Sequence, residues 1–222
     1  MPAPIITRSF KLLVLSLLVT ATQASASLIE PAEPLTSSVT GSAGNHFLND
    51  IDTGISLLPV DDDVVWLHIS LQDRTVSVVR GRNVFHVIPH FAIGINGADN
   101  LRIRGSAMTP KGEFRIERIN PNSQYTTFLG INYPNPAVAE QALATGLITE
   151  EEAERIRRYY LQHRLSYPNT ALGGDIGIHG LGSRDPFLNE RVDWTEGCLA
   201  IENGQIRILS SLVGIDTPVL IQ

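Results

Sequence analysis

Alternating hydrophobic and polar residues predict a β-rich region that begins near residue 64. Three strands are expected before residue 90, at 64–71, 75–80 and 84–89. In the first, apolar residues occupy every second position from Val65 to Leu71, the period of a strand with one buried face. Turn-like polar and glycine residues separate the three strands, and an extended segment at 91–95 follows. Because these turns are short, we expect neighbouring strands to be antiparallel.

Further strands follow a loop at 105–112 that contains a Thr-Pro turn. They are predicted at 114–119, 127–132, 175–179, 198–201 and 218–222. Each is a short extended run, and the run at 114–119 alternates apolar and charged residues. Strands thus dominate the expected secondary structure.

The hydrophobic period changes to that of helices after residue 135. Asn135 followed by Pro136 predicts a helix that ends near Gly146. Thr149, with Glu152 at capping-box spacing, begins a second helix. A third helix is expected at 205–213. The predicted fold is mainly β, with a helical insertion at about 136–165 and a late helix.

The first 62 residues predict two segments outside this fold. Residues 1–26 have a basic start, a short apolar run and an Ala-Ser-Ala site, the pattern of a secretory signal peptide cleaved after about Ala26. An uncleaved anchor is the alternative, but the apolar run is shorter than the ~20 residues of a membrane span. Residues 27–62 are rich in small, polar and proline residues and predict a linker. The remaining domain is expected at 63–222, with membrane contact only during export.

Composition and charge narrow the classes of function. The chain has 222 residues, 43% hydrophobic and 18% charged, which suits one domain with appendages. A formal net charge of −6 without basic runs argues against nucleic acid as a partner. The histidines show no metal-ligand spacing, so no metal or other cofactor is expected.

Cys198 and His179 carry the candidate chemistry. Cys198 is the only cysteine, so it cannot form a disulfide within the chain. A thiol and an imidazole are the parts of a cysteine nucleophile and its general base. Gly197 permits close backbone approach beside the sulfur, and the amides of Gly197 and Cys198 are candidate oxyanion donors. A buried, inert thiol with a hydrogen-bonded histidine is the alternative.

Two acidic neighbours oppose the ionisation of this thiol. Asp193 and Glu196 lie within five positions of Cys198. Negative charge raises the pKa of a thiol. The prediction therefore requires both carboxylates to point away or to be offset.

The motifs around these residues resemble those of a known family. Ile-His-Gly at 178–180, followed by Thr-Glu-Gly-Cys-Leu-Ala-Ile at 195–201, resembles the active-site signature of the L,D-transpeptidases, the YkuD-type catalytic domain. Thr-Pro-Lys-Gly-Glu-Phe at 109–114 matches a further family turn. The resemblance covers about residues 64–222 and implies a β-sandwich or barrel-like domain. The Thr-x-Gly-Cys-x-Ala form is most similar to a branch that includes a peptidoglycan–lipoprotein amidase.

The resemblance also implies an activity and residue roles. The enzyme would act in the periplasm on peptidoglycan stem peptides, in cell-wall cross-linking or remodelling. Cys198 would attack the carbonyl of an L-centre residue, usually the diamino acid at position three, to form a thioester. His179 would act as base and then acid, the Gly180 carbonyl would orient it, and Thr195 would support the loop with Gly197.

The sequence departs from the family signature at two positions. Glu196 stands where the family often has His, and Ala200 where it often has Arg or Asn. Contacts to a substrate carboxylate are therefore expected from elsewhere, with Arg184 and Arg191 as candidates. Solvated loop charges are the alternative for both arginines.

Two aromatic residues are candidates for lining the substrate groove. They are Tyr133, in the Tyr-Pro-Asn motif at 133–135, and Trp194, next to the Thr-x-Gly-Cys motif. Packing in the core is the alternative for each.

Three functions remain open from the sequence. The first is a peptidoglycan L,D-transpeptidase. The second is an amidase or L,D-carboxypeptidase with water as acceptor, such as one that releases a wall-attached lipoprotein. The third is a non-catalytic wall-binding module. The intact pair of Cys198 and His179 favours the two enzymes.

Overall fold

A computed structural model describes residues 62–222. The expected signal peptide, and all but the last residue of the expected linker, lie outside these residues. Nearly all of the expected strands and helices are present, with small changes of boundary. The strands are β1 (Val65–Ser70), β2 (Thr75–Arg80), β3 (Asn83–Pro89), β4 (Ala98–Asp99), β5 (Thr109–Pro110), β6 (Gly112–Ser123), β7 (Thr126–Ile131), β8 (Gly177–His179), β9 (Leu199–Ala200) and β10 (Pro218–Ile221). The helices are α2 (Pro136–Ala144), α3 (Glu150–His163), α4 (Pro186–Asn189) and α5 (Asn203–Leu212).

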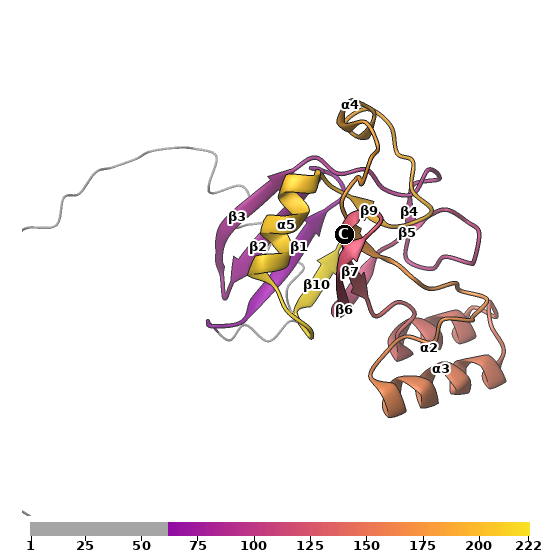
Figure 1. The fold of residues 1–222 in the computed structure, drawn as a ribbon. Coiled ribbons are helices and arrows are strands. Elements are labelled where there is room, and N and C mark those ends of the chain that lie inside the picture. Colours follow the sequence, from indigo (N-terminus) through magenta and orange to yellow (C-terminus); the bar gives the residue numbers. More distant parts are fainter. Residues whose placement is uncertain (1–61) are drawn as a thin grey trace, which may run out of the picture. The chain divides into compact units, whose positions relative to one another are not determined.

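Eight of the strands form one mixed sheet in the order β3-β2-β1-β10-β6-β7-β8-β9 (Figure 1). The first three form the expected antiparallel meander. β10 lies between β1 and β6, parallel to the first and antiparallel to the second. β8 and β9 pair in parallel at the other end. The prediction of a mainly β fold is thus confirmed.

The segment after β3 connects the two edges of this sheet. Ala92 exchanges two backbone hydrogen bonds with Ala200 of β9, at 3.0 and 2.8 Å. Further on, Gly94 bridges Thr195, which precedes β9. The edge strand β9 therefore has backbone partners on both sides. The segment after β3, and not the edge strand β3 itself, therefore covers the β9 edge of the sheet.

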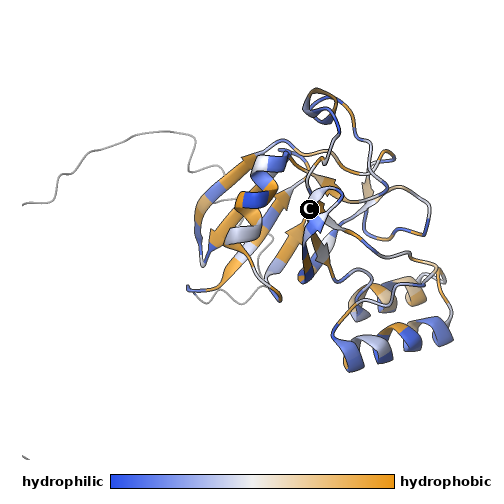
Figure 2. Cartoon of the chain, in the orientation of Figure 1, coloured by the Kyte–Doolittle hydropathy of each residue, from blue (hydrophilic) through white to orange (hydrophobic). Residues whose placement is uncertain are grey.

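The hydrophobic core lies against the central strands. Leu67 and Ile69 of β1 are fully buried in it, as the alternating pattern predicted. The opposite face of β1 is buried as well, because Trp66 packs with Val79 and Leu220 from the neighbouring strands. Figure 2 shows hydrophobic residues concentrated on β1, β2 and β3, and hydrophilic residues along α3.

The predicted caps define the helical insertion. The Asn135 side chain accepts a hydrogen bond from the Val138 amide, and Thr149 accepts one from the Glu152 amide. α2 and α3 pack together and stand beside the sheet in Figure 1. The Glu152 carboxylate does not complete the expected capping box, and instead accepts a hydrogen bond from the Ala171 amide.

The other two helices lie closer to the chemistry. α5 packs against β7 through a face that buries Ile206 and Leu209. The short α4 was not predicted, and it begins at Pro186 with Asp185 as its cap. Within residues 62–222, no helix is long and apolar enough to cross a bilayer.

Candidate active site

The pairing of β8 with β9 brings the two candidate catalytic residues together. Ile178 lies opposite Leu199 and His179 opposite Ala200. In this parallel register Cys198, just before β9, lies level with Gly177. Side chains two positions apart on a strand share a face, so Cys198 and His179 are diagonal neighbours on one face of the sheet.

His179 is held by its own neighbour in the chain. Its Nδ1 lies 2.7 Å from the Gly180 carbonyl oxygen. A carbonyl only accepts hydrogen bonds, so Nδ1 carries the hydrogen and Nε2 is left as the free base. Burial lowers the pKa of His179, against the smaller opposing effect of the Gly180 bond. The imidazole is therefore neutral at pH 7.

Aromatic rings enclose the imidazole. The Tyr125 ring stacks on it with centroids 4.3 Å apart and planes 28° apart. Phe128 and Trp194 lie further out, with ring centroids at 6.3 and 5.9 Å from that of His179. These rings exclude water from a base that must remain unprotonated.

Cys198 is a protonated thiol in the resting structure. It is partly buried, and burial raises its pKa to about 11, although the Gly177 amide donates a hydrogen bond to the sulfur and Arg102 lies nearby. The thiol donates to the Asp175 carbonyl oxygen at 3.5 Å. Attack by this sulfur therefore requires a base to remove its proton, which is the task that the free Nε2 of His179 suits.

Thr195 organises the loop before Cys198. Its hydroxyl donates to the Cys198 carbonyl oxygen at 2.7 Å and accepts from the Gly197 amide at 3.1 Å. The expected support role of Thr195 therefore has a structural basis. The same bond corrects the expectation for Gly197, because its N–H already has a partner and is not free for an oxyanion. What requires glycine here is a φ of +128° and a close approach, since a Cβ would lie 2.6 Å from the Met108 carbonyl oxygen.

The two acidic neighbours of the thiol are placed as the prediction requires. Asp193 forms a bidentate pair with Arg74 at 2.7 and 2.8 Å and accepts a hydrogen bond from the Ile93 amide. Burial raises the pKa of Asp193, but these bonds outweigh it and hold the value below its ordinary range. Glu196 is exposed to solvent. Neither carboxylate makes a hydrogen bond to the sulfur.

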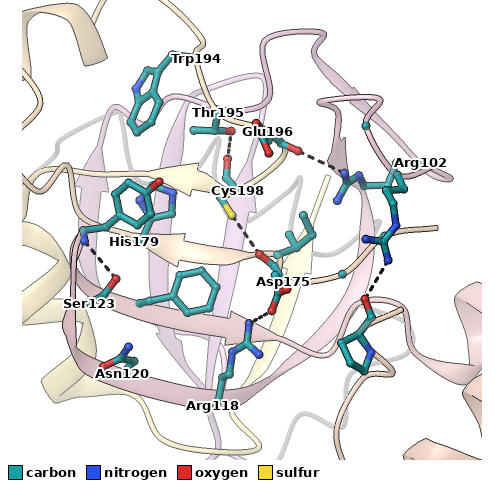
Figure 3. Close-up of a pocket in the computed structure, with 18 of the residues that line it drawn as sticks. Arg102, Arg118, Asn120, Ser123, Asp175, His179, Trp194, Thr195, Glu196 and Cys198 are labelled. Carbon is teal, nitrogen blue, oxygen red and sulfur yellow. Dashed lines mark hydrogen bonds and ion pairs between the residues drawn. The ribbon is translucent and has the colours of Figure 1, made fainter. Parts of the chain in front are cut away.

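A cleft of about 700 Å³ opens over Cys198 and His179 (Figure 3). Its charged wall consists of four arginines and two carboxylates, so it is positively charged within a chain of formal net charge −6. These residues are Arg102, Arg104, Arg118, Arg184, Asp175 and Glu196. Such a cleft suits an anionic, polar substrate.

Comparison with known proteins identifies the domain. Residues 64–221 match the family model of the L,D-transpeptidase catalytic domain, YkuD. The chain belongs to this family. No curated protein matches it.

One solved structure supports the fold of this YkuD domain, and a second is similar to it at a lower score. The helical cell shape determining protein Pgp2 of Campylobacter jejuni superposes with a TM-score of 0.50 at 19% identity, over 73% of this chain and 48% of Pgp2. For Bd1075 of Bdellovibrio bacteriovorus the TM-score is 0.46 at 18% identity, over 72% and 48% of the two chains. The chain spans about half the length of these two structures.

The YkuD cleft contains some of the predicted substrate-binding residues. Trp194 and Arg184 both line it. The Arg184 guanidinium lies 3.9 Å from the centroid of the Trp194 ring, so the two form one cation–π pair. The Trp194 indole also donates to Asn189 of α4 at 2.9 Å, which connects the otherwise unpredicted helix to the cleft.

Two predicted substrate-binding residues lie elsewhere. Tyr133 is fully buried, packs edge-on against Phe114, and donates its hydroxyl to the Arg102 carbonyl oxygen at 3.0 Å. It is a core residue, two positions beyond the end of β7. Arg191 stacks on Phe187 at 3.9 Å and does not line the cleft, because α4 turns this part of the loop away from Cys198.

The sequence missed several residues that the cleft contains. Arg102 and Arg118 come from a loop and a strand where no motif marked them, and Tyr125 lies in a turn between β6 and β7. The carboxylate of Asp175 pairs with Arg118 at 2.6 Å. A single charged or aromatic residue in a loop produces no periodic pattern in the sequence. These positions can therefore be recognised only in the folded structure.

Residues that could bind a metal ion do not cluster in the described domain. Within residues 62–222, no three histidine, cysteine, aspartate or glutamate side chains gather at ligand distances.

Proposed function

We propose that this chain is an exported peptidoglycan L,D-transpeptidase that works through a thioester on Cys198. One observation carries the proposal: β8 and β9 place Cys198 and His179 on the same face of the sheet, below an arginine-rich cleft. Membership of the YkuD family supports the reaction class. Stem peptides carry several carboxylates, which suits the positive charge of the cleft.

The mechanism uses the neutral thiol and neutral imidazole of the resting site. As the sulfur attacks the acyl carbonyl, Nε2 of His179 takes the thiol proton. The resulting imidazolium gives that proton to the amine of the leaving D-residue, and the C–N bond breaks to leave a thioester. An incoming amine then loses its proton to Nε2, attacks the thioester and releases the thiol. The Gly180 carbonyl keeps the ring oriented throughout.

Export to the periplasm is part of the proposal. The pattern of residues 1–26 supports it, because a basic start, an apolar run and Ala-Ser-Ala are typical of a signal peptide, for which we propose cleavage after about Ala26. Fusing residues 1–26 to a periplasmic reporter should export it. Retention of the reporter in the cytoplasm would contradict this part of the proposal.

Hydrolysis is the second candidate, and Glu196 favours it. This carboxylate lines the cleft two residues before Cys198 and replaces the histidine often present in the family. The Glu196 carboxylate is exposed to solvent and makes no hydrogen bond to the sulfur, but it can take a proton from a water molecule that enters the cleft. With water as acceptor, the enzyme would be an amidase or L,D-carboxypeptidase, and a wall-attached lipoprotein would be a substrate of the amidase.

Incubation with purified muropeptides, followed by mass spectrometry, separates these functions. Transfer produces a 3-3 cross-linked dimer, whereas hydrolysis produces only a shortened or released stem. The matched control is Cys198→Ala, which should form neither product. Hydrolysis products alone would rule out the transferase and favour Glu196 as the base, to be checked with Glu196→Gln. Absence of any product, with unchanged wall binding by Cys198→Ala, would favour a binding module.

A further inference from the structure

The guanidinium of Arg102 is buried in the cleft wall with unused hydrogen-bond donors. Arg102 is only 5% exposed. Its Nη2 donates to the Glu196 carbonyl oxygen at 3.3 Å, but Nε and Nη1 are buried without any partner. A buried charged donor without an acceptor is destabilising. Such a group is expected where a ligand supplies the missing acceptor.

The neighbouring arginines of the cleft differ from Arg102. Arg104 donates to the Thr170 and Pro168 carbonyl oxygens at 3.1 Å each. Arg118 is neutralised by Asp175 at 2.6 Å. Arg102 makes no hydrogen bond to a carboxylate among these contacts. Burial lowers its pKa, and the charges of Glu196 and the nearby Tyr133 and Cys198 offset this only in part. The acceptor that it lacks should be an anion.

Arg102 lies next to the nucleophile. Its guanidinium carbon would be 3.3 Å from a Cβ on Gly197, the residue before Cys198. Gly173 approaches from the other side, where a Cβ would lie 3.7 Å from the same carbon. A ligand group that reaches Arg102 is therefore within a few bonds of the atom that Cys198 attacks.

The positions of the base and of Arg102 distinguish the two sides of the scissile bond. In Figure 3, His179 and Arg102 lie on opposite sides of Cys198. His179 must reach the nitrogen of the leaving residue to protonate it, so that residue extends toward His179. The acyl residue, which stays on the sulfur, then extends toward Arg102.

We propose that Arg102 binds a carboxylate in the side chain of the acyl residue, the residue whose carbonyl Cys198 attacks. Nε and Nη1 donate to it, and guanidinium–carboxylate pairs favour such geometry. This inference deepens the proposed function and rests on it for the identity of the peptide. It also gives Arg102 the substrate contact that the sequence assigned to Arg184 and Arg191.

The first test measures the anion site without any stem peptide. Iodoacetate and iodoacetamide alkylate the same thiol and differ by one carboxylate. The ratio of the iodoacetate rate to the iodoacetamide rate at Cys198 should fall about tenfold in Arg102→Met, which corresponds to about 1.4 kcal/mol. Arg102→Lys should show an intermediate ratio. Arg82→Met removes an equal charge from an exposed turn and should leave the ratio unchanged.

The second test identifies the source of the carboxylate. Three tetrapeptides with diaminopimelate at position three are compared. In the parent peptide, the side-chain carboxylate of diaminopimelate and the C-terminal carboxylate are both free. In the second peptide only the side-chain carboxylate is amidated, and in the third only the C-terminal carboxylate. Binding is measured calorimetrically to the full chain with Cys198→Ala. The side-chain amide should bind about tenfold or more weakly, and Arg102→Met in this background should abolish that difference. The C-terminal amide should bind like the parent peptide.

Each other outcome has a defined meaning. An unchanged alkylation ratio in Arg102→Met would overturn the inference. Weaker binding of only the C-terminal amide would overturn the acyl-side assignment. A changed ratio with no binding of any peptide would retain the anion site and reject peptidoglycan as the substrate. Thermal unfolding checks the variants, and Arg102→Met should be no less stable than the parent because the guanidinium is unsatisfied without ligand.

Discussion

The ring of Tyr125 covers one face of the His179 imidazole, with centroids 4.3 Å apart and planes 28° apart. Tyr125 lies in the turn between β6 and β7, whereas His179 ends β8. The contact keeps water from the base, and burial is the main cause of its lowered pKa. Tyr125 thus helps to keep His179 unprotonated, because its ring buries the imidazole.

Removal of this ring should change the pH dependence of the site. In Tyr125→Ala, water reaches the imidazole and the pKa of His179 rises toward 6.5. The acidic limb of Cys198 acylation by a carbapenem should move to higher pH. Tyr125→Phe keeps the stacked ring and should preserve the parent profile. An identical profile in Tyr125→Ala would show that the stack does not control the base.

The parent enzyme should remain reactive in mildly acidic solution. Because the pKa of His179 lies below 6.5, the imidazole stays neutral as the pH falls through that value. The midpoint of the acidic limb of the acylation rate should therefore lie below pH 6.5. His179→Gln, which cannot accept the proton, should lower the rate by a factor of about 100 or more. A midpoint above 6.5 would contradict a desolvated base.

The thiol should destabilise the fold in alkaline solution. Burial raises the pKa of Cys198 from 9.0 to about 11, so the folded chain retains a proton that the unfolded chain loses. The contribution of this thiol to stability is therefore constant below about pH 9 and falls by about 1–3 kcal/mol as the pH rises toward 11. Urea unfolding under reducing conditions measures this loss. Cys198→Ala is the control, because any loss of stability that it shows over this pH range comes from other titrating groups. It should lack the loss that is due to the thiol.

The hydroxyl of Thr195 should matter more than its methyl group. Thr195→Val leaves the Cys198 carbonyl and the Gly197 amide without their partner in a buried loop. Unfolding should become easier by about 1–3 kcal/mol, and acylation of Cys198 should slow. Thr195→Ser keeps both hydrogen bonds and should stay within about 1 kcal/mol of the parent. An equal loss of stability in Thr195→Val and Thr195→Ser would show that packing, and not the two hydrogen bonds, causes the effect.

Local patterns in the sequence determined much of the fold. The alternation in β1 and the caps Asn135 and Thr149 predicted elements that the structure contains, because period and capping act over a few residues. The flanking motifs also singled out Cys198 and His179. Their proximity could not follow from spacing, since it depends on the pairing of β8 with β9.

The tertiary structure alone decided which side chains face the cleft. Tyr133 and Arg191 carried suitable chemistry but point into the core and along α4, whereas Arg102 had no motif and lies beside the nucleophile. The direction and burial of a side chain depend on packing between distant segments, which no local pattern records. The sequence thus determined the elements and the reactive pair, and the packing of the strands and loops decided what surrounds them.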